Sequence, residues 1–61
     1  MFKIETEFDD WMGLREFKKE TTDNWEQVLG AFMIYVGNND CTSCQVFIGE
    51  EEKRILDYTA P

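Results

Sequence analysis

The chain has 61 residues and a formal net charge of −7, with 13 Asp and Glu against six Lys and Arg and no His. A chain of this length forms one domain, residues 1–61, and two cysteines are too few to build a disulfide framework. The negative field should repel nucleic acid and anionic membranes and attract basic protein surfaces, although the charge would also serve plain solubility.

The sequence predicts neither a signal peptide nor a membrane-spanning helix. The N-terminal MFKIETEF lacks the apolar core of a signal peptide. No apolar run approaches the roughly 18 residues that a membrane-spanning helix needs. We therefore expect a cytoplasmic protein whose thiols stay reduced.

Apolar and charged side chains alternate along residues 2–8, which predicts a half-buried strand. One face would carry Phe2, Ile4, Thr6 and Phe8, and the other Lys3, Glu5 and Glu7. A two-residue turn at Asp9 and Asp10 would bring residues 11–18 alongside as a second strand. The expected register pairs Phe8 with Trp11, Ile4 with Arg15, Phe2 with Phe17, and Lys3 with Glu16.

An alternative for this second segment is a helix from Asp10 to Lys19, with acids at its start and lysines at its end. Gly13 in the middle argues against a helix, because glycine weakens helix interiors. We therefore prefer the strand.

Residues 23–37, DNWEQVLGAFMIYVG, carry the signals of a central helix. Asp23 is predicted to cap it, with Glu26 reaching back. Gly37 is predicted to end it in the left-handed conformation. The apolar stripe would be Trp25, Val28, Leu29, Phe32, Met33 and Val36. A strand over residues 30–36 is the competing interpretation, because GAFMIYV is rich in β-formers. The helix is preferred because cap, period and stop signal agree.

The remaining chain predicts a second hairpin. Residues 38–43 read as a polar loop, 45–49 as a strand, 50–53 as a charged turn and 54–59 as the returning strand. Ile48 would lie opposite Leu56, and Val46 opposite Tyr58. The predicted fold class is therefore α+β: a small two-layer ββαββ domain with one central helix packed on an antiparallel sheet.

Cys41 and Cys44 form the one motif-like string, CTSC. A redox CxxC follows a strand and opens a helix, whereas this one would follow a helix and open a strand. Tetrahedral zinc needs four ligands, so a zinc site here would have to be shared between the CTSC loops of two chains. The simpler interpretation is a pair of reduced thiols. We expect no cofactor and no metal, with the shared zinc as the alternative.

No catalytic residues are predicted. The chain has no His for a Ser–His pair and no glycine-rich phosphate loop. A domain this small can hardly form both a core and a catalytic cleft. We therefore expect that it is not an enzyme.

The candidate partner-binding residues are acidic, with one aromatic anchor. Carboxylates along strands and turns can imitate the phosphates that a basic groove binds, although an acidic turn is also a common solvated feature. Ile34 and Tyr35, with Met12 and Leu14, remain as apolar side chains outside the expected core, unless an element is misassigned. The predicted site comprises Glu5, Glu7, Asp9, Asp10, Tyr35, Glu50, Glu51 and Glu52.

In size, charge and aromatic-rich α+β layout the chain resembles the small acidic inhibitors that bacterial viruses encode, of the anti-CRISPR, antitoxin or DNA-mimic type. The phage antitoxin family Dmd is similar in having an acidic cap and a Trp before a central helix, like Asp23 and Trp25, and in ending in a charged hairpin, like VFIGEEEKRILDY. The acidic excess is larger here, and no site residue carries over from the family.

The resemblance implies a non-enzymatic inhibitor that occludes a basic, nucleic-acid-binding host protein in the host cytoplasm. The alternative is a homodimeric structural or adaptor protein, with or without the shared zinc.

Overall fold

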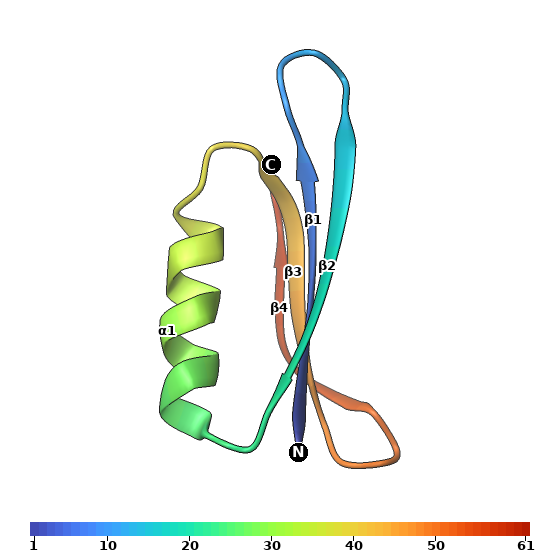
Figure 1. Ribbon diagram of the computed structural model, residues 1–61, viewed down its shortest axis with the longest axis vertical. Coiled ribbons are helices and arrows are strands. Elements are labelled where there is room, and N and C mark those ends of the chain that lie inside the picture. Colours follow the sequence, from blue (N-terminus) through green and yellow to red (C-terminus); the bar gives the residue numbers. More distant parts are fainter.

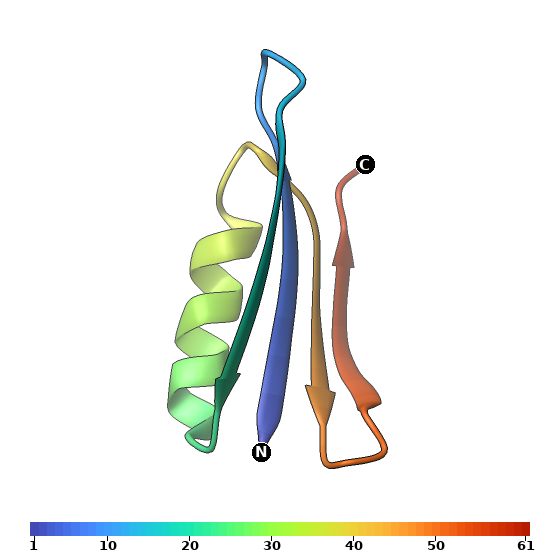
Figure 2. The same cartoon turned by 45° about the vertical axis from the view of Figure 1, so that its right-hand side comes forward.

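The computed structural model describes residues 1–61 and confirms the ββαββ order and the α+β class (Figure 1). A single helix lies along one face of a four-stranded antiparallel sheet, and the other face is left open (Figure 2). At twelve residues, that helix lacks the length a membrane crossing requires. The elements are β1 (Phe2–Asp9), β2 (Arg15–Thr22), α1 (Trp25–Val36), β3 (Cys41–Ile48) and β4 (Lys53–Thr59).

The strand order is β2-β1-β3-β4, so β1 and β3 are central and β2 and β4 are the edges. β1 runs antiparallel to both of its neighbours. The connection from β2 to β3 therefore crosses over β1, and α1 forms this crossover. The core lies where α1 covers the central strands, and its buried residues are Ile4, Thr6, Val28, Cys41, Cys44 and Val46.

The predicted register of the first hairpin is wrong. Phe2 pairs with Thr22 instead of Phe17, a shift of five positions. The predicted pairs Phe8–Trp11, Ile4–Arg15 and Lys3–Glu16 are lost with it, and so is the alternative helix from Asp10 to Lys19. Because the shift is an odd number, every side chain of β2 changes face. Phe17 now lies opposite Glu7 on the open face and is 72 % exposed.

The cause lies in the connection, which is a loop of residues 10–14 instead of a two-residue turn. The Asp10 carboxylate accepts the backbone N–H groups of Met12 and Leu14, both at 2.9 Å. Gly13 takes a positive φ of 82°, which glycine adopts without strain. An aspartate that bonds its own loop backbone favours such a turn.

The helix forms where predicted, which excludes the strand over residues 30–36, but its ends differ. Asn24 is the N-cap: its Oδ1 accepts the N–H groups of Glu26 at 2.9 Å and Gln27 at 3.4 Å. The carboxylate of Asp23 lies 3.6 Å from the N-terminal ammonium. Gly37 has a φ of −76°, in the right-handed region, so the predicted left-handed stop is wrong.

The buried stripe of α1 is rotated relative to the prediction. Val28 is fully buried, and Phe32 and Tyr35 pack against the core. Met33, which was expected in the core, is 74 % exposed. Tyr35, which was expected outside, packs its ring edge-on against Phe8 with centroids 5.7 Å apart. The helix therefore turns Val28, Phe32 and Tyr35 toward the sheet and leaves Met33 outside.

The CTSC segment is part of β3 and not a loop. Between Glu7, which pairs with Ser43, and Phe8, which pairs with Cys41, the register shifts at a bulge. This extra residue, Thr42, lets two cysteines three positions apart face the helix together. In the second hairpin Val46 pairs with Leu56 instead of Tyr58, a shift of two that keeps Leu56 and Tyr58 on their predicted face. Between Val46 and Phe47 the register shifts again, so that Phe47 pairs with Arg54 and Ile48 with Lys53 instead of Leu56.

Candidate functional site

The predicted acidic residues of β1 lie on the open face of the sheet, beside cations. Glu5 Oε1 is 3.5 Å from Lys3 Nζ and 3.8 Å from Lys19 Nζ. Glu7 and Asp9 lie 3.9 and 3.6 Å from Nε of Arg15. Their charges are therefore largely balanced locally, and this face presents mixed charge to a partner.

The second predicted group lies in the turn between β3 and β4. The turn containing Glu50, Glu51 and Glu52 and the loop 10–14 occupy opposite ends of the 35 Å long axis (Figure 1). Glu52 Oε1 is 2.6 Å from Lys3 Nζ, a hydrogen bond that raises the pKa of Lys3 and lowers the pKa of Glu52. Lys3 therefore bridges Glu52 to Glu5 of β1, whereas Asp10 lies in the loop at the opposite end of the long axis.

The two thiols lie inside the core. Burial raises the pKa of both Cys41 and Cys44. Cys41 Sγ donates to the carbonyl of Ser43 at 3.5 Å, and Cys44 Sγ lies 3.6 Å from the hydroxyl of Thr6. No cluster of three or more His, Cys, Asp or Glu side chains is present. A zinc ion shared by two CTSC loops would need thiols at the surface, so the geometry does not support that alternative.

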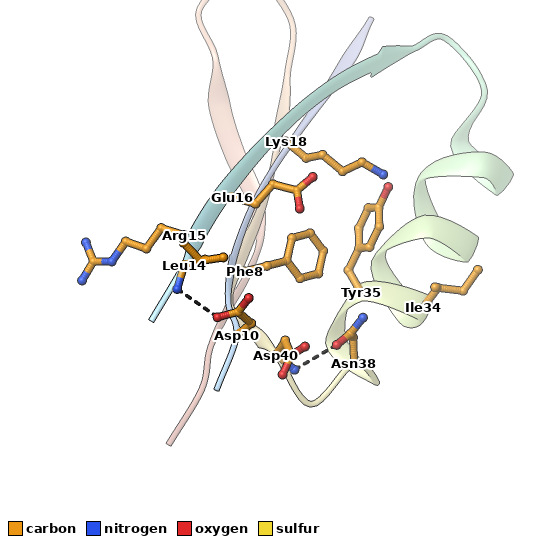
Figure 3. Close-up of a pocket in the computed structure, with 10 residues that line it drawn as sticks. All are labelled: Phe8, Asp10, Leu14, Arg15, Glu16, Lys18, Ile34, Tyr35, Asn38 and Asp40. Carbon is orange, nitrogen blue, oxygen red and sulfur yellow. Dashed lines mark hydrogen bonds between the residues drawn. The ribbon is translucent and has the colours of Figure 1, made fainter. Parts of the chain in front are cut away.

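The structure instead forms a groove between the loop 10–14, β2 and the C-terminal end of α1, with a volume of about 750 Å³ (Figure 3). We call it the loop–helix groove. Two of the predicted site residues, Asp10 and Tyr35, line it. Its lining consists of Phe8, Leu14, Ile34 and Tyr35 as apolar or aromatic side chains and Asp10, Arg15, Glu16, Lys18, Asn38 and Asp40 as polar ones.

Tyr35 is held in place within this groove by three neighbours. Its ring meets Phe8, and its hydroxyl donates to Glu20 Oε2 at 2.6 Å. Burial and the bond to Glu20 together raise the pKa of Tyr35 to about 12. The Lys18 ammonium lies 5.4 Å from the centre of the ring, within the range of a cation–π contact. The aromatic wall of the groove is therefore preorganised and already accommodates one cation.

The rim of the groove is acidic. Neither Glu16 nor Asp40 has a cation within ion-pair distance, and both are exposed. The Asp10 carboxylate is held by loop N–H groups and also has no cationic partner. Arg15 points away from the groove in Figure 3, toward its ion pairs with Glu7 and Asp9. The lining of the groove therefore includes three carboxylates without an ion-pair partner and one ammonium, that of Lys18.

Apolar side chains are exposed next to the groove. Ile34 and Leu14, which line it, are 71 % and 65 % exposed. Met12 and Trp11 in the loop and Met33 on α1 are exposed as well. The prediction that Ile34, Met12 and Leu14 lie outside the core is therefore confirmed, whereas Tyr35 is partly buried.

Comparison with known proteins finds no relative. No protein-family model matches the chain, and no match is found among the curated proteins or the solved structures. Function is therefore inferred from geometry and charge.

Sequence reasoning missed Phe8, Glu16, Lys18 and Asp40 as members of the site. Glu16 was expected opposite Lys3, and the shift in register placed it on the groove side opposite Phe8. Asp40 belongs to the polar stretch after α1 and had no local signal that distinguished it. The pairing of β1 with β2 places Glu16 beside Phe8, and the backbone hydrogen bond from the Asp9 N–H to the Asp40 carbonyl, at 2.8 Å, brings Asp40 to the end of β1.

Proposed function

We propose that this chain is a non-enzymatic inhibitor protein that binds a basic surface of another protein and occludes it. One observation carries this proposal: the negative charge is mostly uncompensated. Six of the 13 carboxylates have a cation within ion-pair distance, and seven do not. The seven are Asp10, Glu16, Glu20, Glu26, Asp40, Glu50 and Glu51.

These carboxylates extend along the body of the molecule. Asp10 belongs to the loop at one end of the 35 Å long axis, and Glu50 and Glu51 to the turn at the other. An elongated negative body complements an elongated basic groove, such as one that binds nucleic acid. The proposed target is therefore a nucleic-acid-binding protein of the host cell, approached by electrostatic steering.

The test is affinity capture from a bacterial lysate at about 50 mM and then about 500 mM salt, because screening weakens exposed charge interactions over this range. We expect a basic protein to be retained at low salt and released at high salt. With that protein purified, the association rate should fall for Glu51→Lys and rise for Lys53→Glu. These substitutions form a matched pair of opposite sign, one in the turn and one at the start of β4. Binding that ignores salt and both substitutions would contradict the proposal.

A second candidate function has one observation in its favour. The outward side of α1 exposes Met33 and Ile34, and an exposed apolar surface on so small a domain suits an adaptor or a homodimer. This function predicts binding that is insensitive to salt but lost on Met33→Ser. Sedimentation of the purified chain separates self-association from binding to another protein.

A further inference from the structure

The loop–helix groove has both an apolar, aromatic wall and an acidic rim. Its aromatic wall, Phe8 and Tyr35, lies beside an acidic rim, and Leu14 and Ile34 extend the apolar surface outward. Along α1, residues 28–36 contain no polar side chain except Tyr35, so the exposed helix surface next to the rim is apolar. A ligand for this site needs positive charge and apolar surface at once.

We propose that this groove is the docking site for the basic partner, and that its occupant is an arginine side chain flanked by apolar residues. This inference rests on the proposed function. A guanidinium is planar, stacks on aromatic rings and forms two parallel hydrogen bonds with a carboxylate. The groove offers a ring at Tyr35 and free carboxylates at Glu16 and Asp40.

The position of Lys18 supports a cationic occupant. Its ammonium lies over the Tyr35 ring and has no carboxylate within ion-pair distance. The ring face therefore already attracts a cation, and the rim carboxylates are left for an incoming one. The aliphatic neighbours of the incoming arginine would cover Leu14 and Ile34, which solvent now reaches.

Charge disfavours a second copy of this chain as the occupant. Each copy has a net charge of −7, and the groove is itself acidic. Two such surfaces brought together would place like charges face to face, which opposes association. A basic partner instead gains from the same field.

The direct test uses a defined probe, the acetylated and amidated peptide Leu-Arg-Leu-Arg-Leu. Its control replaces each arginine with citrulline, which has nearly the same shape but no charge. The probe is titrated to millimolar concentration into isotope-labelled protein, and amide chemical shifts are followed by NMR. We expect shifts at Phe8, Leu14, Ile34 and Asp40, with much smaller ones for the citrulline peptide.

Two double variants test whether peptide binding depends on the carboxylates of the groove or only on net charge. Glu16→Gln with Asp40→Asn should weaken peptide binding about two- to fivefold per carboxylate, the range of exposed ion pairs. Glu50→Gln with Glu51→Gln changes the net charge equally at the far end of the long axis and should weaken peptide binding much less, because only long-range attraction is reduced. The amide spectrum of each variant reports whether it is folded.

Three outcomes would overturn the inference. The first is an absence of shifts, or shifts centred on residues 49–53. The second is equal weakening in both double variants, which would mean that only net charge matters. The third is a change at the same amides on raising the protein concentration without peptide, which would make a second copy the occupant.

Failure of this inference is distinguishable from failure of the proposed function. If the groove double variant still captures the salt-released protein and the Glu50 and Glu51 variant does not, the function stands and the docking site lies at the other end. If the peptide binds the groove but no basic protein is captured in a salt-dependent way, the inference about the groove is supported and the proposed function is contradicted.

Discussion

At the scale of single residues, Tyr35 connects the helix to the edge strand. Its hydroxyl donates to Glu20 of β2, its ring packs on Phe8 of β1, and Lys18 lies over the ring. β2 is otherwise an exposed edge strand with polar side chains on the helix side. These contacts therefore add a connection between β2 and α1 to the pairing of β2 with β1, and they form the wall of the groove.

Removing the Tyr35 hydroxyl should reduce the loss of folding stability that occurs as the pH rises above 10. The folded-state pKa of about 12 exceeds the ordinary 10.0, so the protonated phenol stabilises the fold below pH 10 and this contribution is lost as pH rises toward 12. Tyr35→Phe should lower the free energy of unfolding by about 0.5–1.5 kcal/mol at pH 7. Its difference from the wild type should shrink above pH 10.

Urea unfolding at pH 7 and at steps from pH 10 to 12 measures this difference. Tyr58→Phe is the control, because no hydrogen bond to the Tyr58 hydroxyl is present. A difference between Tyr35→Phe and wild type that stays constant to pH 12 would show that the bond to Glu20 is not formed in solution.

At the scale of the element, α1 differs from the prediction in two ways. Its N-cap is Asn24 instead of Asp23, and its core-facing side includes Tyr35 instead of Met33. Two adjacent polar residues compete for the cap, and Asn24 holds it while Asp23 lies near the N-terminal ammonium. The choice depends on where β2 ends, since Thr22 bonds both Asn24 and Gln27.

The cap assignment predicts unequal effects of two neighbouring substitutions. Asn24→Ala should lower the free energy of unfolding by about 1 kcal/mol, because it removes the acceptor for two helix N–H groups. Asp23→Ala should change it by less than about 0.5 kcal/mol, since its only ion pair is exposed. Chemical denaturation of both variants decides between them, and the reverse order would restore Asp23 as the cap.

The orientation of α1 predicts that substitutions at Val28 and Met33 have different effects on stability. Val28→Ala should destabilise by about 2 kcal/mol, because Val28 is fully buried and its removal leaves a cavity. Met33→Ala should stay within about 0.5 kcal/mol, because the side chain is mostly exposed. Both substitutions introduce the same residue in one helix, so the difference in their denaturation midpoints reports burial. Equal effects would show that the helix packs as its apolar stripe suggests.

At the scale of the whole molecule, the charge is not uniform. The open face of the sheet pairs its acids with Lys3, Arg15, Lys19 and Arg54, whereas the loop–helix groove and the turn containing Glu50 and Glu51 carry unpaired carboxylates. A partner therefore meets mixed charge across the open face of the sheet. Unpaired carboxylates lie at both ends of the long axis and also on β2, at Glu16 and Glu20, and on α1, at Glu26.

This distribution predicts that salt stabilises the protein. Raising NaCl from about 50 to about 500 mM screens repulsion among unpaired carboxylates more than it weakens the few exposed ion pairs. We expect the melting temperature to rise by roughly 5 °C, the shift that about 1 kcal/mol gives in a domain of this size. The variant Glu50→Gln with Glu51→Gln should show a smaller rise. A melting temperature that falls with salt would mean that the ion pairs of the open face dominate.

The elements of this protein follow from local patterns in its sequence, and their arrangement does not. Alternation along residues 2–8 and the period of 3.6 after Asn24 are properties of neighbouring residues, so β1, α1 and the two-layer fold could be predicted. The register of β2 depended on how Asp10 and Gly13 shape a loop, and the burial of both cysteines depended on a bulge at Thr42. The groove joins Phe8, Glu16, Tyr35 and Asp40 from four separate segments, and only packing across the sheet brings them together.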